Sequence, residues 1–295
     1  MIERFFKRIL CSVLCSGAVY MAMAQHIVTP LNADDVLDEA KWKGRWIGLD
    51  RLVEGEDLSD KTRVNARYLR TEFQVADKPV RQAKVYIAAV GYYELYVNGS
   101  RKGGDYVLTP VQTDTRKSII YNAIDVTENL QQGKTCALGV ILGNGRAVPM
   151  RYQKHYKCPF MGFPKCRVEL IVTYADGKTQ RVSSDDRTWK VTAEGPIRSN
   201  NEYDGEVYDA NREMAGWAKP GFDDSKWNNA ERTEIPLGAL YPQTAKNQKA
   251  VPLNKEYKLY GDIIDLGQNI AGWVSLRVRG ENIPDQRYVP SKPQS

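Results

Sequence analysis

Three acidic residues on one short segment form the densest group of side chains that could do chemistry. They are Asp204, Glu206 and Asp209, and Tyr203 precedes them. On an extended segment, residues two apart project to the same side, so Asp204 and Glu206 would lie next to each other. Such proximity raises the pKa of one carboxyl group and could make an acid–base pair. A contact with a cation or a sugar is a separate alternative. A turn whose carboxylates accept backbone hydrogen bonds is the simpler alternative, and all these interpretations stay open.

Turn residues elsewhere offer oxygen and nitrogen groups for a metal or a sugar. Calcium takes about six to eight oxygen ligands, often carboxylates and loop carbonyls. Asp105, Asp114 and Asn144 lie in predicted turns and could supply some of them, although no spacing resembles an EF-hand loop. Calcium is therefore the one cofactor that the sequence suggests. Hydrogen-bonding side chains in the same loops and in the acidic segment are predicted to contact carbohydrate: Asn144, Arg146, Arg151, Tyr203, Asp204 and Glu206.

Three cysteines lie outside the N-terminal apolar segment, namely Cys136, Cys158 and Cys166. An odd number allows at most one internal disulfide. Cys158 and Cys166 flank a loop short enough to close in an oxidising compartment. A disulfide between them and three buried free thiols are both left open.

Residues 1–24 are typical of a signal peptide. Basic residues precede an apolar stretch over 9–23, and the small-x-small triplet at 22–24 ends it. About 15 apolar residues are fewer than the ~20 that a membrane-spanning helix needs. We therefore expect an exported protein, in the periplasm, on the cell surface or outside the cell, with no membrane span after the signal is removed.

The composition of the 295-residue chain excludes several classes. It is 42% hydrophobic and 26% charged, which is not typical of collagen-like, disordered or coiled-coil proteins. The formal net charge of +6 is small and scattered, so nucleic acid is not an expected partner. Two histidines argue against a multi-histidine metal site.

The elements that must position these groups are predicted to be strands almost everywhere. Apolar residues alternate or form short runs between turn residues, and Asn98-Gly99 and Asp176-Gly177 are strong hairpin signals. Only residues 32–41 have helical character. The pattern predicts an all-β, antiparallel β-sandwich, with Trp217 and Trp227 expected to anchor its core.

Three segments carry a resemblance to a known family. They are Ala89–Gly99 (AVGYYELYVNG), Leu138–Gly145 (LGVILGNG), and the stretch from Gly195 to Trp227 that contains YDGEVYDA. Together they resemble the N-terminal β-sandwich module of bacterial α-L-rhamnosidases, glycoside hydrolase family seventy-eight. The resemblance implies a jelly-roll, galactose-binding-like sandwich.

The resemblance and the Pro-rich stretch near residue 240 suggest a domain division. Residues 25–45 would be an N-terminal segment, 46–236 the sandwich and 237–256 a linker. Residues 257–280 look like the start of a second, concanavalin-like β module. Residues 281–295 are predicted to be an aberrant or disordered tail.

The resemblance implies a parent enzyme that hydrolyses terminal α-L-rhamnosides in glycans with inversion, using carboxylates on an (α/α)6 barrel. Twelve helices at a mean of about 11–12 residues need roughly 140 helical residues, and only one short segment here has helical character. We therefore expect a truncated, inactive chain that acts as a scaffold for the barrel and as a sugar-binding module. The alternative is a stand-alone, calcium-assisted binding protein for rhamnose-containing glycans.

Overall fold

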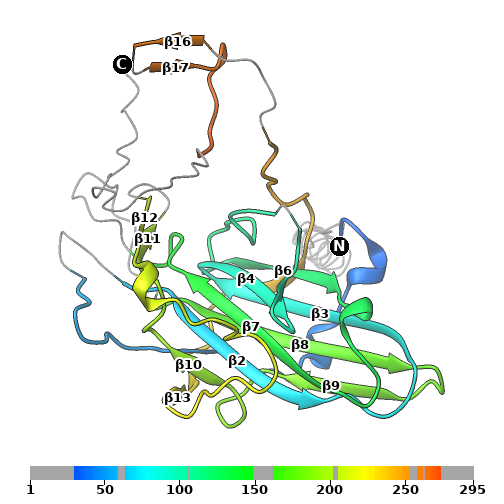
Figure 1. The fold of residues 1–295 in the computed structure, drawn as a ribbon. Coiled ribbons are helices and arrows are strands. Elements are labelled where there is room, and N and C mark those ends of the chain that lie inside the picture. The colour runs from blue at the N-terminus through cyan, green and yellow to red at the C-terminus, as the bar shows by residue number, and fades with distance from the viewer. Residues whose placement is uncertain are drawn as a thin grey trace, which may run out of the picture. The chain divides into compact units, whose positions relative to one another are not determined.

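The computed structural model describes residues 30–58, 64–104, 106–148, 162–201, 205–252, 258–261 and 263–273. These ranges contain short strands and four 3-10 turns, and no α-helix is found within them (Figure 1). The all-β class predicted from the sequence is therefore confirmed. None of the helical turns in the described ranges is long and apolar enough to cross a membrane.

Two sheets pack face to face as a β-sandwich (Figure 1). The first sheet has the order β14-β1-β8-β3-β6-β15, with β9 also paired to β8. Its strands are β14 (Glu231–Arg232), β1 (Ile47–Gly48), β8 (Lys165–Tyr174), β3 (Val80–Val90), β6 (Ser118–Asp125), β15 (Ala239–Pro242) and β9 (Thr179–Ser183). The second sheet has the order β13-β10-β2-β7-β4-β5. Its strands are β13 (Asn228–Asn229), β10 (Lys190–Thr192), β2 (Arg67–Gln74), β7 (Thr135–Gly143), β4 (Tyr92–Val97) and β5 (Ser100–Arg101).

The core lies between the two sheets and follows the period of two expected for strands. Val85 and Ile87 of β3 are fully buried, as are Val140 and Leu142 of β7, and all four belong to one cluster. The other face of the first sheet is also covered, because Trp42 packs edge-on against Tyr121 at a ring-centroid distance of 5.4 Å. The first sheet is therefore buried on both faces.

Both predicted hairpin turns are confirmed. Asn98 and Gly99 join β4 to β5 with φ values of 51° and 80°, and Gly177, between β8 and β9, has a φ of 79°. These left-handed backbone conformations favour glycine and asparagine, which explains why the dipeptides are reliable signals.

The helix-like segment 32–41 forms two 3-10 turns, η1 (Ala33–Asp35) and η2 (Glu39–Lys41), instead of an α-helix. The side chains of Asn32 and Asp38 accept backbone hydrogen bonds at the starts of these turns. Two separate caps within ten residues leave no room for a continuous helix. The segment is nevertheless part of the sandwich, since Leu37 belongs to the second core cluster.

The region predicted to be a linker, 237–256, contains a strand of the sandwich. β15 pairs in parallel with β6, and Lys249 forms an isolated antiparallel bridge with Tyr106. The chain divides into two compact units after Lys249, and the second contains one hairpin, β16 (Lys258–Tyr260) with β17 (Ile263–Asp265). The predicted signal peptide and C-terminal tail lie outside the described residues.

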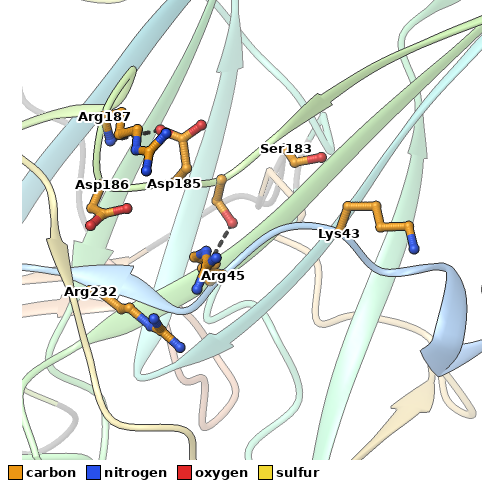
Figure 2. Close-up of a pocket in the computed structure, with 8 residues that line it drawn as sticks. Lys43, Arg45, Ser183, Asp185, Asp186, Arg187 and Arg232 are labelled. Atoms are coloured by element: carbon orange, nitrogen blue, oxygen red, sulfur yellow. Dashed lines mark hydrogen bonds between the residues drawn. The ribbon is translucent and has the colours of Figure 1, made fainter.

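A hollow of about 370 Å³ lies beside the edge of the first sheet, between residues 43–45 and residues 183–187 (Figure 2). The buried carboxylate of Glu169 on β8 holds both walls. It accepts hydrogen bonds from the backbone N–H groups of Lys43 (3.0 Å) and Gly44 (2.8 Å). It also accepts from the Ser183 hydroxyl at 2.9 Å and from Arg181 at 2.9 Å. One internal charge therefore positions both sides of the hollow.

Candidate functional site

Asn144, in the loop after β7, fastens a separate hairpin to the sandwich. This hairpin consists of β11 (Ile197–Asn201) and β12 (Gly205–Tyr208). The backbone N–H of Asn144 donates to Asn200 Oδ1 at 2.6 Å, and its Nδ2 donates to the Asn200 carbonyl at 2.9 Å. Asn144 Nδ2 also donates to the Val64 carbonyl at 2.7 Å. Gly143 allows this approach, because a Cβ there would lie 3.0 Å from Asn200 Oδ1.

Two polar atoms at this junction are buried without a hydrogen-bond partner in the part of the chain that the structure describes. They are Oδ1 of Asn144, an acceptor, and Nδ2 of Asn200, a donor. Buried polar groups are nearly always paired, so the unpaired acceptor and the unpaired donor each require an explanation. Both atoms have almost no accessible surface, so an enclosed water, which donates and accepts hydrogen bonds, could satisfy them, whereas a sugar would reach them only if the junction opened.

Glu206 lies directly opposite Asn200 in the β11–β12 register. Desolvation raises the pKa of the Glu206 carboxyl, and the negative charge of Glu94 raises it further. Glu94 is on β4, where it accepts a hydrogen bond from the Tyr96 hydroxyl at 2.8 Å and pairs with Arg101 at 3.0 Å. The hairpin therefore brings a second carboxylate close to one on the outer face of the second sheet.

Aromatic rings cover the same outer face. Trp217 meets Tyr68 and Tyr96 edge-on, at ring-centroid distances of 5.3 and 5.2 Å. It also stacks on Trp227 at 6.3 Å. Gly139 on β7 makes room, because a Cβ there would lie 2.7 Å from the Trp217 ring. Trp217 and Trp227 are thus half-buried on the outside of the sandwich, and the prediction that they anchor its core is wrong.

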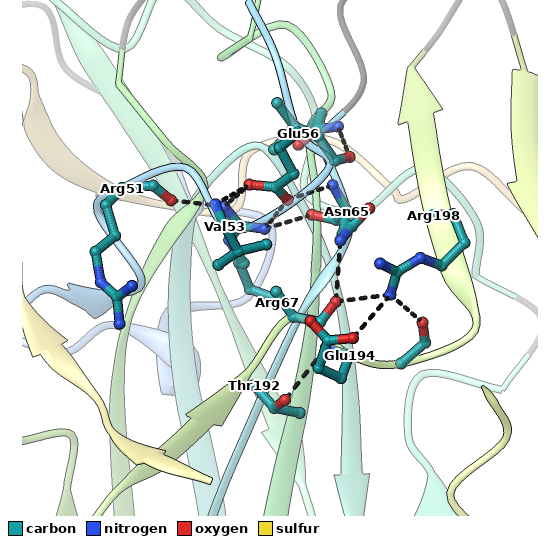
Figure 3. A network of polar contacts seen from close by, with 12 residues as sticks. Arg51, Val53, Glu56, Asn65, Arg67, Thr192, Glu194 and Arg198 are labelled. Carbon is teal, nitrogen blue, oxygen red and sulfur yellow. Dashed lines mark hydrogen bonds and ion pairs between the residues drawn. The ribbon is translucent and has the colours of Figure 1, made fainter.

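A buried ion pair fixes the chain beside Val64, whose carbonyl accepts a hydrogen bond from Asn144 (Figure 3). Arg67 donates to both carboxylate oxygens of Glu56, and neither side chain is exposed to solvent. Glu56 also accepts from the backbone N–H of Asn65 at 2.8 Å, and Asn65 Nδ2 donates to the Ala193 carbonyl at 3.1 Å. These bonds hold residues 64–67 against the chain that leads into the β11–β12 hairpin.

The structure brings together only part of the predicted sugar-binding set. Asn144 and Glu206 are linked through Asn200, whereas Arg146 is exposed in the loop that follows Asn144. The remaining three residues lie outside the described residues: Arg151, Tyr203 and Asp204. The sugar-binding set therefore stays a prediction.

The predicted metal and disulfide residues are only partly described. Both oxygens of Asp114 accept from Arg116, at 2.8 and 3.0 Å, and this pairing lowers the pKa of Asp114. Asp105 lies outside the described residues, within which no group of three acidic, histidine or cysteine side chains could hold a metal ion. Cys166 is a buried free thiol, and Cys158 is not described. The calcium site and the disulfide stay predictions.

The sequence reasoning missed Glu94 and Asn200. Tyr92, Glu94 and Tyr96 are two residues apart along β4, so period-two spacing alone puts the three residues on one face. The sequence therefore contained the signal for Glu94. Asn200 carries no motif, and its role depends on a contact with a residue 56 positions away in sequence.

Comparisons with known proteins agree with this fold. Residues 78–252, more than half of the chain, match the family described as the α-L-rhamnosidase N-terminal domain. An α-L-rhamnosidase from Formosa agariphila is 35% identical in an alignment 266 residues long that covers 82% of this chain and 27% of the relative. The chain thus spans about a quarter of the length of that curated relative.

Solved structures show the same similarity. The α-L-rhamnosidase of Dictyoglumus thermophilum is 40% identical, with a TM-score of 0.58 over 70% of this chain and 23% of that one. The Streptomyces avermitilis α-L-rhamnosidase complexed with L-rhamnose is 31% identical, with a TM-score of 0.61 over 70% of this chain and 20% of that one. The chain therefore belongs to the α-L-rhamnosidase family and contains its N-terminal domain.

Proposed function

We propose that this chain is the non-catalytic N-terminal region of an exported α-L-rhamnosidase, and that its β-sandwich is a scaffold for the rest of that enzyme. The observation that carries the proposal is the family match over residues 78–252, combined with relatives about four times longer than the matched part. The activity, hydrolysis of terminal α-L-rhamnosides, would then belong to the part of the relatives that this chain does not match.

The carboxylates of the described residues support a non-catalytic role. Glycosidases generally hold two carboxyl groups about 5–9.5 Å apart on either side of the scissile bond. Glu94 and Glu206 interact electrostatically, but Glu94 is already bound to Arg101 and Tyr96, so it is not free to act on a substrate.

Exposed apolar side chains support the scaffold role. Ile235 and Leu237, between β14 and β15, are 71% and 86% exposed, and Val207 and Tyr208 of β12 are about half exposed. Apolar groups left in water on a folded domain often mark a contact surface. We assign Ile235 and Leu237, the more exposed pair, to a contact surface for the catalytic part of an α-L-rhamnosidase.

An assay for hydrolysis tests the proposal. The purified chain is incubated with 4-nitrophenyl α-L-rhamnoside, and release of nitrophenol is expected to equal that of the buffer alone. Saturable turnover that disappears in the Glu206→Gln variant would contradict a non-catalytic role. For the scaffold surface, the I235S/L237S variant should bind less of a hydrophobic dye than the V36S/L52S variant, whose side chains are also exposed. Equal dye binding would argue against that surface.

Sugar binding at the hairpin junction is the second candidate function. It is favoured by Glu206 and Tyr208, which are exposed and two residues apart on β12, so that a carboxylate and an aromatic ring leave the same face of the hairpin. Titration calorimetry with L-rhamnose, with and without calcium, measures it. Binding that is lost in Glu206→Gln and kept in Glu234→Gln, an exposed glutamate elsewhere, is the expected result. No heat at millimolar sugar would reject this function.

A further inference from the structure

The lining of the hollow in Figure 2 includes four exposed cationic side chains. Lys43, Arg45, Arg187 and Arg232 make no side-chain hydrogen bond and no ion pair within 4.0 Å among the described residues. Most other described arginines are engaged. Arg67 and Arg116, for example, bind carboxylates, and Arg167 binds backbone carbonyls.

A second hollow of about 250 Å³ adjoins the first and shares Lys43, Arg45 and Arg232 with it. Arg167 lines this second hollow, and its Nε donates to the Gly44 carbonyl at 2.7 Å. The positive charge is therefore continuous from one hollow to the next. Residues 43 and 45 are two apart on an extended segment, so their side chains leave the same side about 6.6 Å apart.

The acidic side chains of the first hollow neutralise only part of this charge. Asp185 accepts from the backbone N–H groups of Arg187 at 2.8 Å and Thr188 at 2.6 Å. Burial raises the pKa of Asp185, but these hydrogen bonds outweigh burial and lower it. Asp186 is the other carboxylate of the lining. The lining therefore holds four cations and two carboxylates. One of these carboxylates, Asp185, already accepts hydrogen bonds from the backbone of its own turn.

The walls are fixed before any ligand arrives. Glu169 holds both sides, and the Ser184 hydroxyl donates to the Arg45 carbonyl at 2.6 Å. Gly44 lies so close to β8 that a Cβ would be 2.4 Å from the Val168 carbonyl. A cationic hollow on a fixed backbone suits a ligand with charged oxygens, because hydrogen bonds between two charged groups are stronger than those between neutral groups.

We propose that the two hollows form a binding site for the charged groups, sulfate esters or carboxylates, of an acidic polysaccharide. The choice of a polysaccharide as the carrier rests on the proposed function, since α-L-rhamnosidases act on glycans. Nucleic acid fits less well, because Trp46, the one aromatic residue of the two linings, is buried and cannot stack on a base.

Affinity electrophoresis of the full chain tests the site. Gels contain dextran sulfate, polygalacturonate, uncharged dextran or single-stranded DNA. The K43Q/R45Q/R232Q variant removes three cations of the hollows. The R81Q/K134Q/K226Q variant removes three exposed cations that do not line them, so both variants lose the same net charge.

We expect retardation by dextran sulfate, polygalacturonate or both, and the response to each identifies the anionic group. The hollow variant should bind about tenfold more weakly than the unmodified chain, and the control variant should stay within about twofold. Equal weakening in both variants, no retardation by either acidic polysaccharide, or tighter retention by DNA would overturn the proposal. Because no rhamnoside is hydrolysed in this experiment, its failure is separate from failure of the proposed function.

Discussion

The carboxylate of Glu56 and the guanidinium of Arg67 form an ion pair whose side chains are both fully removed from solvent. Removal of one partner leaves a buried charge without compensation, which typically costs about 3–5 kcal/mol. We predict a loss of this size in the free energy of unfolding for Glu56→Gln, measured by urea denaturation.

The pair of Arg51 and Glu231 is the matched control, since these side chains are 53% and 35% exposed. Exposed pairs contribute about 0–1 kcal/mol, so Arg51→Gln should change the stability little. Similar losses in the two variants would contradict the distinction.

Gly139→Ala tests the packing of Trp217 on the outer face of the second sheet. A Cβ at 139 would lie 2.7 Å from the indole ring, and overpacking of this kind costs roughly 1–3 kcal/mol. In a Trp217→Ala background the same change should cost less, because the clashing ring is gone and only the Ala218 Cβ, 2.8 Å from the added atom, remains in the way. Thermal denaturation of the unmodified chain, the two single variants and the double variant gives the coupling energy between residues 139 and 217. Additive losses of stability would show that the ring is not the obstacle.

Asn200→Ala should loosen the β11–β12 hairpin and leave the sandwich intact. The variant loses the bond from the Asn144 N–H to Asn200 Oδ1. A net loss of about 1 kcal/mol corresponds to roughly fivefold faster hydrogen exchange by local opening. Exchange monitored by mass spectrometry should quicken over 197–208 and stay constant in β7. Asn211→Ala, at an exposed turn, is the control and should leave both regions unchanged.

Tyr208 provides a pH-dependent prediction. Its hydroxyl donates to the Glu213 carboxylate at 2.6 Å, which stabilises the neutral phenol and raises its pKa to about 12. In Glu213→Gln this pKa should fall toward about 10, the ordinary value for tyrosine. Ultraviolet difference titration measures the change.

The same shift fixes the sign of the effect on stability. Below about pH 10 the folded and unfolded chains both keep the Tyr208 proton, so the Tyr208–Glu213 hydrogen bond makes its full contribution to the free energy of unfolding. Between about pH 10 and 12 the unfolded chain loses the proton first, and the contribution disappears. Identical titration curves for the two chains would contradict the role of Glu213.

Local signals in the sequence predicted the strands and the tight turns. Asn98-Gly99 and Asp176-Gly177 needed no knowledge of the rest of the chain, because the dipeptides themselves favour a positive φ. The period of two predicted strands, and alternate residues of β3 such as Val85 and Ile87 do lie in the core. It could not decide where Trp217 lies, since a loop residue carries no such period.

Contacts between distant segments were beyond local reasoning. β15 is four residues long and pairs with β6, more than a hundred positions earlier, so its proline-rich surroundings resembled a linker. The junction of Asn144 with Asn200 was missed for the same reason. Glu169 gave no signal either, because a buried carboxylate is recognised only by the four donors around it.

The parallel pairing of β15 with β6 has a mechanical consequence. Tension applied to the chain beyond Lys249 would first reach the Tyr106–Lys249 bridge and then the ladder from Ala239 to Pro242. A pull along the strand axis would load the rungs of this ladder together, as a shear joint, whereas a perpendicular pull would peel them apart one by one. A force on the chain after Lys249 therefore meets this four-residue ladder before it reaches β6 and the inner strands of the sheet.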